Sequence, residues 1–369
     1  MSKANLKAML RFGVSPYDGP SLIFDLSALE ARFRRLGALE VRFRMDVRFA
    51  VKSFPWPEVL HLAAKHVAGF DVSNAAELEM VPPARVISLT NPVLRLDALP
   101  DLRRKANQAV VYLECAEDLA VVDWVPAPVL VGLRLSPATL RVAANTEAGD
   151  FSRFGADGVA LAALKTLDAE RFSGFLVHYG GEQTADDIIT YARGMVALAR
   201  AHGLPLRSAN LGGGLAGVGL DALEPLCAAL RSIVPTETTL VLEPGEICAE
   251  DTGLALGRVM SVRRYAEGWI ATIDLSRELH LQWTRPQILH AGKGPAEAPV
   301  RIFGPTCYER DYFGTFRIPV VDLDTPPYAR DQWVGFTGIN GYAAALNHGF
   351  NGIAPARVVV AHFSPIAGA

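Results

Sequence analysis

The chain has 369 residues and a formal net charge of −3, with 50% hydrophobic and 20% charged residues. This composition is typical of a globular protein and excludes an intrinsically disordered one. The balanced charge gives no reason to expect nucleic acid or an anionic membrane as a partner. Neither a secretory signal nor a stretch of 18 apolar residues is found, which predicts a cytoplasmic protein. The four cysteines are widely spaced without a CxxC pair, so neither a metal site nor a disulfide framework is predicted.

Short apolar segments alternate with amphipathic helical patterns between residues 47 and 243. Strands are expected at 47–52, 69–72, 85–89, 109–114, 128–135, 173–178, 207–212 and 239–243. Helical spacing of apolar residues is found at 57–66, 75–81, 115–125, 158–167, 185–202 and 221–234. Eight continuous apolar strands alternating with helices favour an α/β fold, a (β/α)8 TIM-like barrel, because parallel strands are buried on both faces. The barrel is expected to span residues 27–247.

The pattern changes after Glu243 to short strands separated by Gly, Pro and Asp. They are expected at 253–264, 268–275, 299–304, 316–323, 331–336 and 356–363. These segments predict an antiparallel β-domain of residues 248–369. The segment 21–26 is a further strand candidate, so residues 1–26 are expected to complete this domain.

Chemically useful residues stand at the ends of the predicted barrel strands, where barrel enzymes carry their active sites. Lys52 ends the first strand, His178 the sixth and Glu243 the eighth, while Gly212–Gly214 follow the seventh. Only seven of the 36 basic residues are lysines, and a desolvated Lys can lose its proton and act as a nucleophile, which Arg cannot.

Each of these residues also has a structural interpretation when it is taken alone. A strand-end lysine can extend to solvent, three glycines can form a tight turn, and a lone His or Glu can be satisfied at the rim. Together, however, they are the groups needed to hold pyridoxal 5′-phosphate: an amine, an aromatic ring, a phosphate cradle and a carboxylate.

The motifs resemble, over nearly the whole chain, the pyridoxal-phosphate-dependent decarboxylases with an alanine-racemase-like barrel (fold type III). This family includes diaminopimelate, ornithine and carboxynorspermidine decarboxylases. "FAVKSFPWPEVL" is similar to the family's lysine segment, which implies that Lys52 forms the Schiff base. "LVHYGGEQ" implies that His178 stacks on the cofactor ring. "NLGGGLA" implies that Gly212, Gly213 and Gly214 hold the phosphate. "LEPGE" implies that Glu243 pairs with the ring nitrogen and that Gly245 contacts the cofactor.

Two segments of the β-domain extend the resemblance. "FGPTCYERDYFG" is similar to a segment that reaches the neighbouring subunit's active site. The similarity implies Cys307 as a proton donor and Asp311 as a nearby polar contact that binds the substrate. "INGYAAALNHGFNGI" implies that Tyr342 binds the phosphate. The resemblance therefore implies a homodimer with shared active sites.

The resemblance implies decarboxylation at Cα of a basic or carboxylated amino acid, and departures from the family pattern bear on the substrate. Glu246 stands where the family often has Arg, and Tyr308 stands where an acidic residue often reads a distal ammonium. Both are candidate substrate-binding residues. The mixture of motifs favours a carboxynorspermidine-like substrate, or a related substrate of a specialised biosynthetic pathway.

Other functions stay open at this point. Diaminopimelate or ornithine/lysine decarboxylation is the main alternative, and an amino-acid racemase or a non-catalytic pyridoxal-phosphate-binding protein is a further one. Racemases of this fold pair the ring nitrogen with Arg, so Glu243 argues for decarboxylation. A metal-dependent barrel hydrolase would need clustered His and Asp ligands, and no metal site is predicted.

Overall fold

The computed structural model describes residues 19–93, 99–119, 125, 128–140, 152–156, 158–164, 167–178, 180–265, 268–289 and 294–363. These residues form two compact units. One runs from Glu30 to Cys248, and the other consists of the described residues on either side of that range. The first 18 residues of the expected β-domain and residues 120–124 of the helix expected at 115–125 lie outside the described residues.

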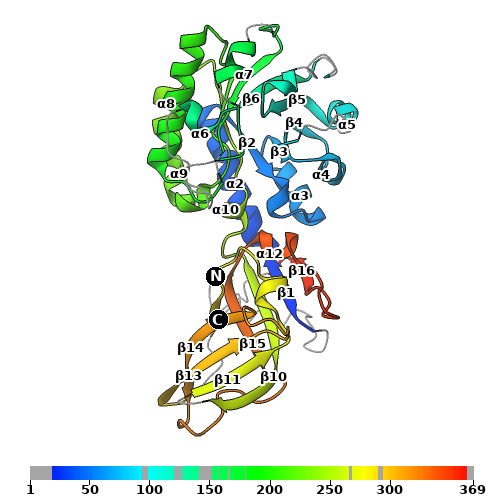
Figure 1. The fold of residues 1–369 in the computed structure, drawn as a ribbon, viewed down its shortest axis with the longest axis vertical. Helices are drawn as coiled ribbons and strands as arrows, with labels where there is room; N and C mark the ends of the chain where they lie inside the picture. The colour runs from blue at the N-terminus through cyan, green and yellow to red at the C-terminus, as the bar shows by residue number, and fades with distance from the viewer. Residues whose placement is uncertain are drawn as a thin grey trace. The chain divides into compact units, whose positions relative to one another are not determined.

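The first unit is a closed barrel of eight parallel strands that pair in chain order, which confirms the predicted fold class. The strands are β2 (Met45–Ala50), β3 (Gly69–Val72), β4 (Ala84–Thr90), β5 (Ala106–Leu113), β6 (Leu130–Arg134), β7 (Phe172–Leu176), β8 (Ser208–Asn210) and β9 (Thr239–Leu242). The helices are α2 (Leu26–Phe43), α3 (Pro57–Ala64), α4 (Ala75–Met80), α5 (Leu99–Lys105), α6 (Pro137–Leu140), α7 (Gly158–Ala163), α8 (Ala185–His202), α9 (Leu223–Ile233) and α10 (Glu246–Ala249). Figure 1 shows α8 and α9 on one side of the strands and α3, α4 and α5 on the other.

Local sequence explains where the barrel helices begin and end. Helix α8 starts at a reciprocal cap between Thr184 and Asp187, and it ends at Gly203, whose φ of 64° is left-handed. Helix α3 has Pro57 at its first position, where the missing N–H costs nothing. Helix α2 is held to the strands by Glu40, whose Oε1 accepts the backbone N–H groups of Val47 and Ala68, both at 2.7 Å.

The side chains of β2 alternate between the helix layer and the barrel interior. Phe49 packs edge-on against Phe33 of α2, at 5.2 Å between ring centroids. Asp46, Arg48 and Ala50 occupy the alternate positions of the strand, and all three are buried. The interior is therefore not purely apolar along this strand.

The second unit is a sheet of eight strands. Its strands are β1 (Ser21–Asp25), β10 (Gly253–Tyr265), β11 (Gly268–Ile273), β12 (Gln287–Leu289), β13 (Ala296–Phe303), β14 (Tyr312–Val320), β15 (Trp333–Ile339) and β16 (Arg357–Ala361), with short helices α11 (Arg277–His280) and α12 (Gly341–Ala345). As predicted, the early strand β1 joins this sheet, where it pairs with both β10 and β16.

Two features of this sheet differ from the sequence-based expectation of an antiparallel domain. The pairs β1–β16 and β11–β13 are parallel, so the sheet is mixed. The three-residue strand β12 and the helix α11 were not predicted, because both are too short to show a periodic pattern. Within the described residues, no helix is long and apolar enough to cross a membrane.

Candidate active site

The predicted site residues of the barrel lie just beyond the C-terminal ends of their strands. Lys52 lies in the 3-10 turn Val51–Ser53 that follows β2, His178 lies two residues after β7, and Glu243 directly follows β9. The backbone N–H of Ala50 donates to the Pro244 carbonyl at 3.0 Å. A Cβ built on Gly245 would be 3.0 Å from the Ser53 Cβ, so the turns that carry Lys52 and Glu243 are in contact.

The Glu243 carboxylate is buried and accepts hydrogen bonds from neighbouring strands. Its Oε1 accepts from Asn210 Nδ2 at 2.6 Å and from Ser88 Oγ at 3.3 Å. Burial and the charge of Asp71 raise the pKa of Glu243 to about 7, against the opposing effects of Asn210, Arg48 and Lys52. The side chain is therefore poised to exchange a proton or a cationic partner near neutral pH.

Asp71 on β3 is a second buried carboxylate at this rim. It accepts from Ser88 Oγ at 3.0 Å and from Thr90 Oγ1 at 2.9 Å. Burial raises its pKa, and the charge of Lys52 and these hydrogen bonds oppose the shift. Because the Ser88 hydroxyl lies within hydrogen-bond distance of both carboxylates, Asp71 and Glu243 are near neighbours, and the charge of Asp71 acts directly on Glu243.

His178 is neutral at pH 7. Burial, followed by the positive charges of Lys52 and Arg134, moves its pKa well below the usual value. The backbone N–H of Gly213 donates to His178 Nδ1 at 3.2 Å, which assigns the ring proton to Nε2. A neutral imidazole held at one edge is suited to lie flat against another aromatic ring.

A buried ion pair fixes the backbone at the end of β7. Arg134 donates from Nη1 to Glu114 Oε1 at 2.8 Å and from Nη2 to the carbonyl of His178. Its guanidinium also lies over the ring of Phe154, at 4.2 Å from the centroid. Because these groups are rigidly partnered, His178 is held in place through its own main chain.

The three glycines are required by close packing. A Cβ on Gly212 would be 2.6 Å from the Val177 carbonyl oxygen, and one on Gly213 would be 2.7 Å from that of Glu243. Gly212 and Gly214 also have φ values of 63° and 74°. The N–H of Gly212 donates to Asn210 Oδ1 at 2.9 Å and that of Gly213 to His178 Nδ1 at 3.2 Å, so these two N–H groups are bonded within the protein.

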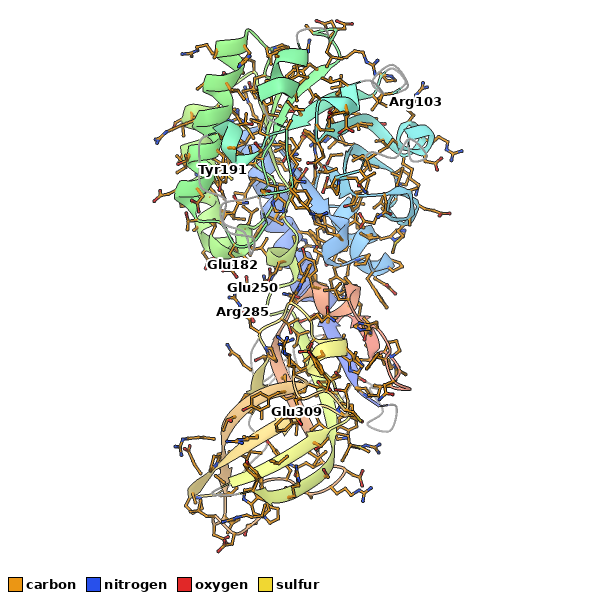
Figure 2. The ribbon with its side chains drawn as sticks, in the orientation of Figure 1. Arg103, Glu182, Tyr191, Glu250, Arg285 and Glu309 are labelled. Atoms are coloured by element: carbon orange, nitrogen blue, oxygen red, sulfur yellow. The ribbon has the colours of Figure 1, made fainter. Side chains whose placement is uncertain are left out.

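Gln183 is an unexpected polar residue beside this loop. Its side chain is 3% exposed, yet neither Oε1 nor Nε2 has a hydrogen-bond partner in the described part of the chain. Its Nε2 is 3.2 Å from the Cβ position of Gly214. The preceding residue, Glu182, is exposed (Figure 2). A buried amide without partners costs free energy unless a ligand or water completes it.

The remaining predicted residues belong to the β-rich unit, except for Glu246, which opens α10. Cys307 and Tyr308 are exposed, and Tyr342 on α12 packs edge-on against Trp283 at 5.1 Å. Asp311 is 1% exposed. Its carboxylate accepts from Ser276 Oγ, the Arg277 N–H and Thr306 Oγ1, and these bonds shape the turn that carries Cys307.

Comparison with known proteins agrees with this geometry. The family model described as "Pyridoxal-dependent decarboxylase, pyridoxal binding domain" matches residues 26–250, more than half of the chain. Diaminopimelate decarboxylase of Pseudomonas aeruginosa is 26% identical over 346 residues, covering 83% of this chain and 79% of the relative.

Solved structures share the fold at lower identity. Lysine/ornithine decarboxylase of Vibrio vulnificus complexed with cadaverine has a TM-score of 0.78 and 20% identity, covering 94% of each chain. Carboxynorspermidine decarboxylase of Campylobacter jejuni complexed with norspermidine has a TM-score of 0.71 and 18% identity, covering 93% of this chain and 94% of that one.

The barrel and its rim therefore define a pyridoxal-dependent enzyme of the TIM-barrel class. The chain belongs to the family of pyridoxal-dependent decarboxylases, whose model matches more than half of it. Its cofactor is pyridoxal phosphate.

The residues at the rim fit this cofactor. A lysine amine, a neutral histidine ring, a carboxylate with a raised pKa and the unpartnered Gln183 amide surround a glycine loop. Within the described residues, no group of three or more His, Cys, Asp or Glu side chains could hold a metal ion.

Sequence reasoning missed four residues that shape the site: Arg48, Asp71, Arg134 and Gln183. Asp71 and Arg134 end or nearly end barrel strands, so the rule that identified Glu243 could have found them. Arg48 lies inside an apolar strand, and only its spacing from Asp46 and Ala50 indicates the barrel interior.

We expect the Glu243 carboxyl to make the cofactor-free protein less stable as pH rises from 5.5 to 8.0. His178, whose pKa is lowered, contributes the opposite trend, which is present equally in wild type and Glu243→Gln. The native pKa of Glu243 is about 7, above the ordinary 4.5, so the native state holds its proton longer than the unfolded state does. This stabilisation is complete below pH 4.5 and is lost as pH rises through 7, at a cost of about 2 kcal/mol between pH 5.5 and 8.0. Urea unfolding at the two pH values measures it.

Glu243→Gln should reduce this pH dependence. Part of it should remain, because the pKa of Glu40 is also raised to about 7, mainly by burial. Glu224, an exposed partner of Arg42, offers a matched control, and Glu224→Gln should leave the full dependence in place. An unchanged pH dependence in Glu243→Gln would contradict the expectation.

Proposed function

We propose that this decarboxylase removes the Cα carboxylate of a basic or carboxylated amino acid, with carboxynorspermidine-like compounds as the first class to test. Diaminopimelate, ornithine and lysine are the alternative substrates. Support comes from the names of the relatives and neighbours and from the motif mixture in the Lys52, His178 and Cys307 segments. Glu246 and Tyr308 are proposed to contact the distal part of the substrate.

The observation that carries the proposal is the buried Glu243 carboxylate, held by Asn210 among Lys52, His178 and Asp71. The cofactor, when bound, supplies an electron sink for the pair released as the carboxylate leaves. Glu243 would keep the ring nitrogen protonated through an ionic hydrogen bond, which a carboxylate can do and an arginine cannot. This role favours decarboxylation over racemisation.

The other rim residues bind and orient. Lys52 would hold the cofactor through its amine, and the neutral ring of His178 would stack on the cofactor ring. Gly212, Gly213, Gly214 and Gly245 would face the phosphate, with Tyr342 as a further contact. The buried Gln183 amide is proposed as an additional phosphate donor, because Nε2 lies beside Gly214 and has no partner in the described residues.

We propose that the active unit is a homodimer in which Cys307 serves the partner's site as the acid that protonates Cα. The exposure of Cys307 leaves its thiol available for that role. The hydrogen bonds that the Asp311 carboxylate accepts from Ser276 and Thr306 support a role in ordering the turn that carries Cys307. This role is in addition to the proposed contact of Asp311 with the substrate. All four cysteines are free, which supports a reducing compartment such as the cytoplasm.

Release of CO2 from a substrate panel tests the function. Protein loaded with cofactor should release CO2 from one or more of carboxynorspermidine, carboxyspermidine, meso-diaminopimelate, ornithine, lysine and arginine. Lys52→Ala should reduce the rate at least about a thousandfold, because the amine that holds the cofactor is lost. If Cα exchanges its hydrogen with solvent and no CO2 appears, racemisation replaces decarboxylation as the activity.

Subunit complementation tests the shared site. Lys52→Ala and Cys307→Ala are each expected to have little activity alone. If Cys307 acts in the partner's site, mixed dimers place both defects in one site and leave the other intact, so mixing should restore activity to about a quarter of wild type. Mixtures that stay as inactive as their parents would exclude action in the partner's site.

Gln183→Leu tests the proposed phosphate donor. Loss of a hydrogen bond to a charged group should weaken pyridoxal phosphate binding to the cofactor-free protein roughly 10- to 100-fold. Affinity for pyridoxal, which lacks the phosphate, should change little. Fluorescence titration measures both, with Glu182→Gln as the exposed neighbouring control. Equal losses for the two ligands would show that Gln183 does not contact the phosphate.

A further inference from the structure

Arg48 is a buried charge that the barrel does not fully satisfy. Its side chain is 1% exposed, and Nη2 donates to Asp46 Oδ2 at 3.2 Å. Its Nε and Nη1 atoms are buried without a hydrogen-bond partner in the described part of the chain. Removing a guanidinium from water with two of its three nitrogens unpaired is costly, and the negative charges of Asp46 and Glu243 favour the charged form of Arg48.

The strand register places Arg48 beside Glu243. Strand β2 pairs with β9 so that Asp46 is opposite Val241 and Val47 is opposite Leu242. The next positions of this parallel pair are Arg48 and Glu243, and paired residues of parallel strands point to the same face. On the other side of β2, Ala50 is opposite Asp71. The register therefore places Arg48 next to Glu243 and one inward position before Ala50, the partner of Asp71.

The charges that act on Glu243 come from three elements around it. Asp71 on β3 is negative, while Arg48 on β2 and Lys52 on the following turn are positive. Asn210, Ser88 and Tyr112 contribute neutral polar groups from β8, β4 and β5. Lys52 is the residue proposed to bond to the cofactor, so its free ammonium group is present only while that bond is not formed. Arg48 is always charged and stays in place.

We propose that Arg48 is a positioning residue that holds Glu243 as a carboxylate from inside the barrel, without touching the cofactor. The importance of this role for catalysis rests on the proposed pairing of Glu243 with the ring nitrogen. The negative charge of Asp46 weakens the attraction of Arg48 for Glu243, because Asp46 pairs with Arg48. Asp46 also pairs with the half-exposed Arg85, whose Nη1 is 3.1 Å from Asp46 Oδ1. On this proposal, the electrostatic potential at Glu243 is set in part by charged residues inside the barrel.

Direct titration of Glu243 tests the proposal without any turnover. Cofactor-free protein labelled with carbon-13 at the glutamate carboxyl is titrated by NMR, and the Glu243 resonance is identified by its loss in Glu243→Gln. The wild-type midpoint is expected near 7. Arg48→Met should raise it by about one pH unit or more, and Arg48→Lys should restore most of the shift.

Two further variants make the test independent of the folding of Arg48→Met. Asp46→Asn removes the counter-charge of Arg48 and should lower the Glu243 midpoint. Arg85→Met removes the outer partner of Asp46 and should leave the midpoint within about 0.3 units, because Arg85 is 58% exposed and is not among the charges that shift Glu243. An unchanged midpoint in both Arg48→Met and Asp46→Asn would overturn the proposal.

The loaded protein separates this proposal from the one on which it rests. The absorption spectrum of the bound cofactor is followed against pH in wild type and Arg48→Met. A shifted spectral midpoint together with a shifted Glu243 midpoint supports both ideas. A shifted Glu243 midpoint with an unchanged cofactor spectrum supports the role of Arg48, and it overturns instead the pairing of Glu243 with the ring.

Discussion

The site depends on the parallel pairing of eight strands in a closed barrel. This pairing brings residues from β2, β3, β7, β8 and β9 to one rim, although they are separated by up to about 190 positions in the chain. It also fixes their order, because Arg48 is next to Glu243 and Ala50 is next to Asp71 only in this register. A shift of one residue in β2 would turn Arg48 toward the helices and remove it from the interior.

The barrel interior gives up stability to hold this arrangement. Asp71 and Glu243 are buried with raised pKa values, and Arg48 has two unpaired nitrogens in the described part of the chain. An apolar core would avoid these costs, but it could not present a proton-exchanging carboxylate to a ligand. The glycine loop is constrained as well, because its close contacts leave no room for a side chain.

Much of this organisation could be predicted from the sequence. All eight barrel strands were located because buried parallel strands are continuous apolar runs, and the strand-end rule identified Lys52, His178 and Glu243. The mixed pairing of the second sheet could not be predicted, since β1 and β16 are distant in sequence and pattern does not reveal partners. Gln183 could not be predicted as a site residue, because its burial depends on the packing of Gly214 against it.

Strand β2 runs through the whole depth of the barrel, and its inward positions lead from Asp46 to the turn of Lys52. Asp46 and Arg48 also line a polar cavity of about 260 Å³ with residues that begin the strands, such as Ser208 and Thr239. The face of the barrel opposite the rim therefore carries a charged residue, Arg48, that acts electrostatically on Glu243. Evolution could retune the acidity of the site from this face while leaving substrate recognition untouched, so the two properties can diverge independently among relatives.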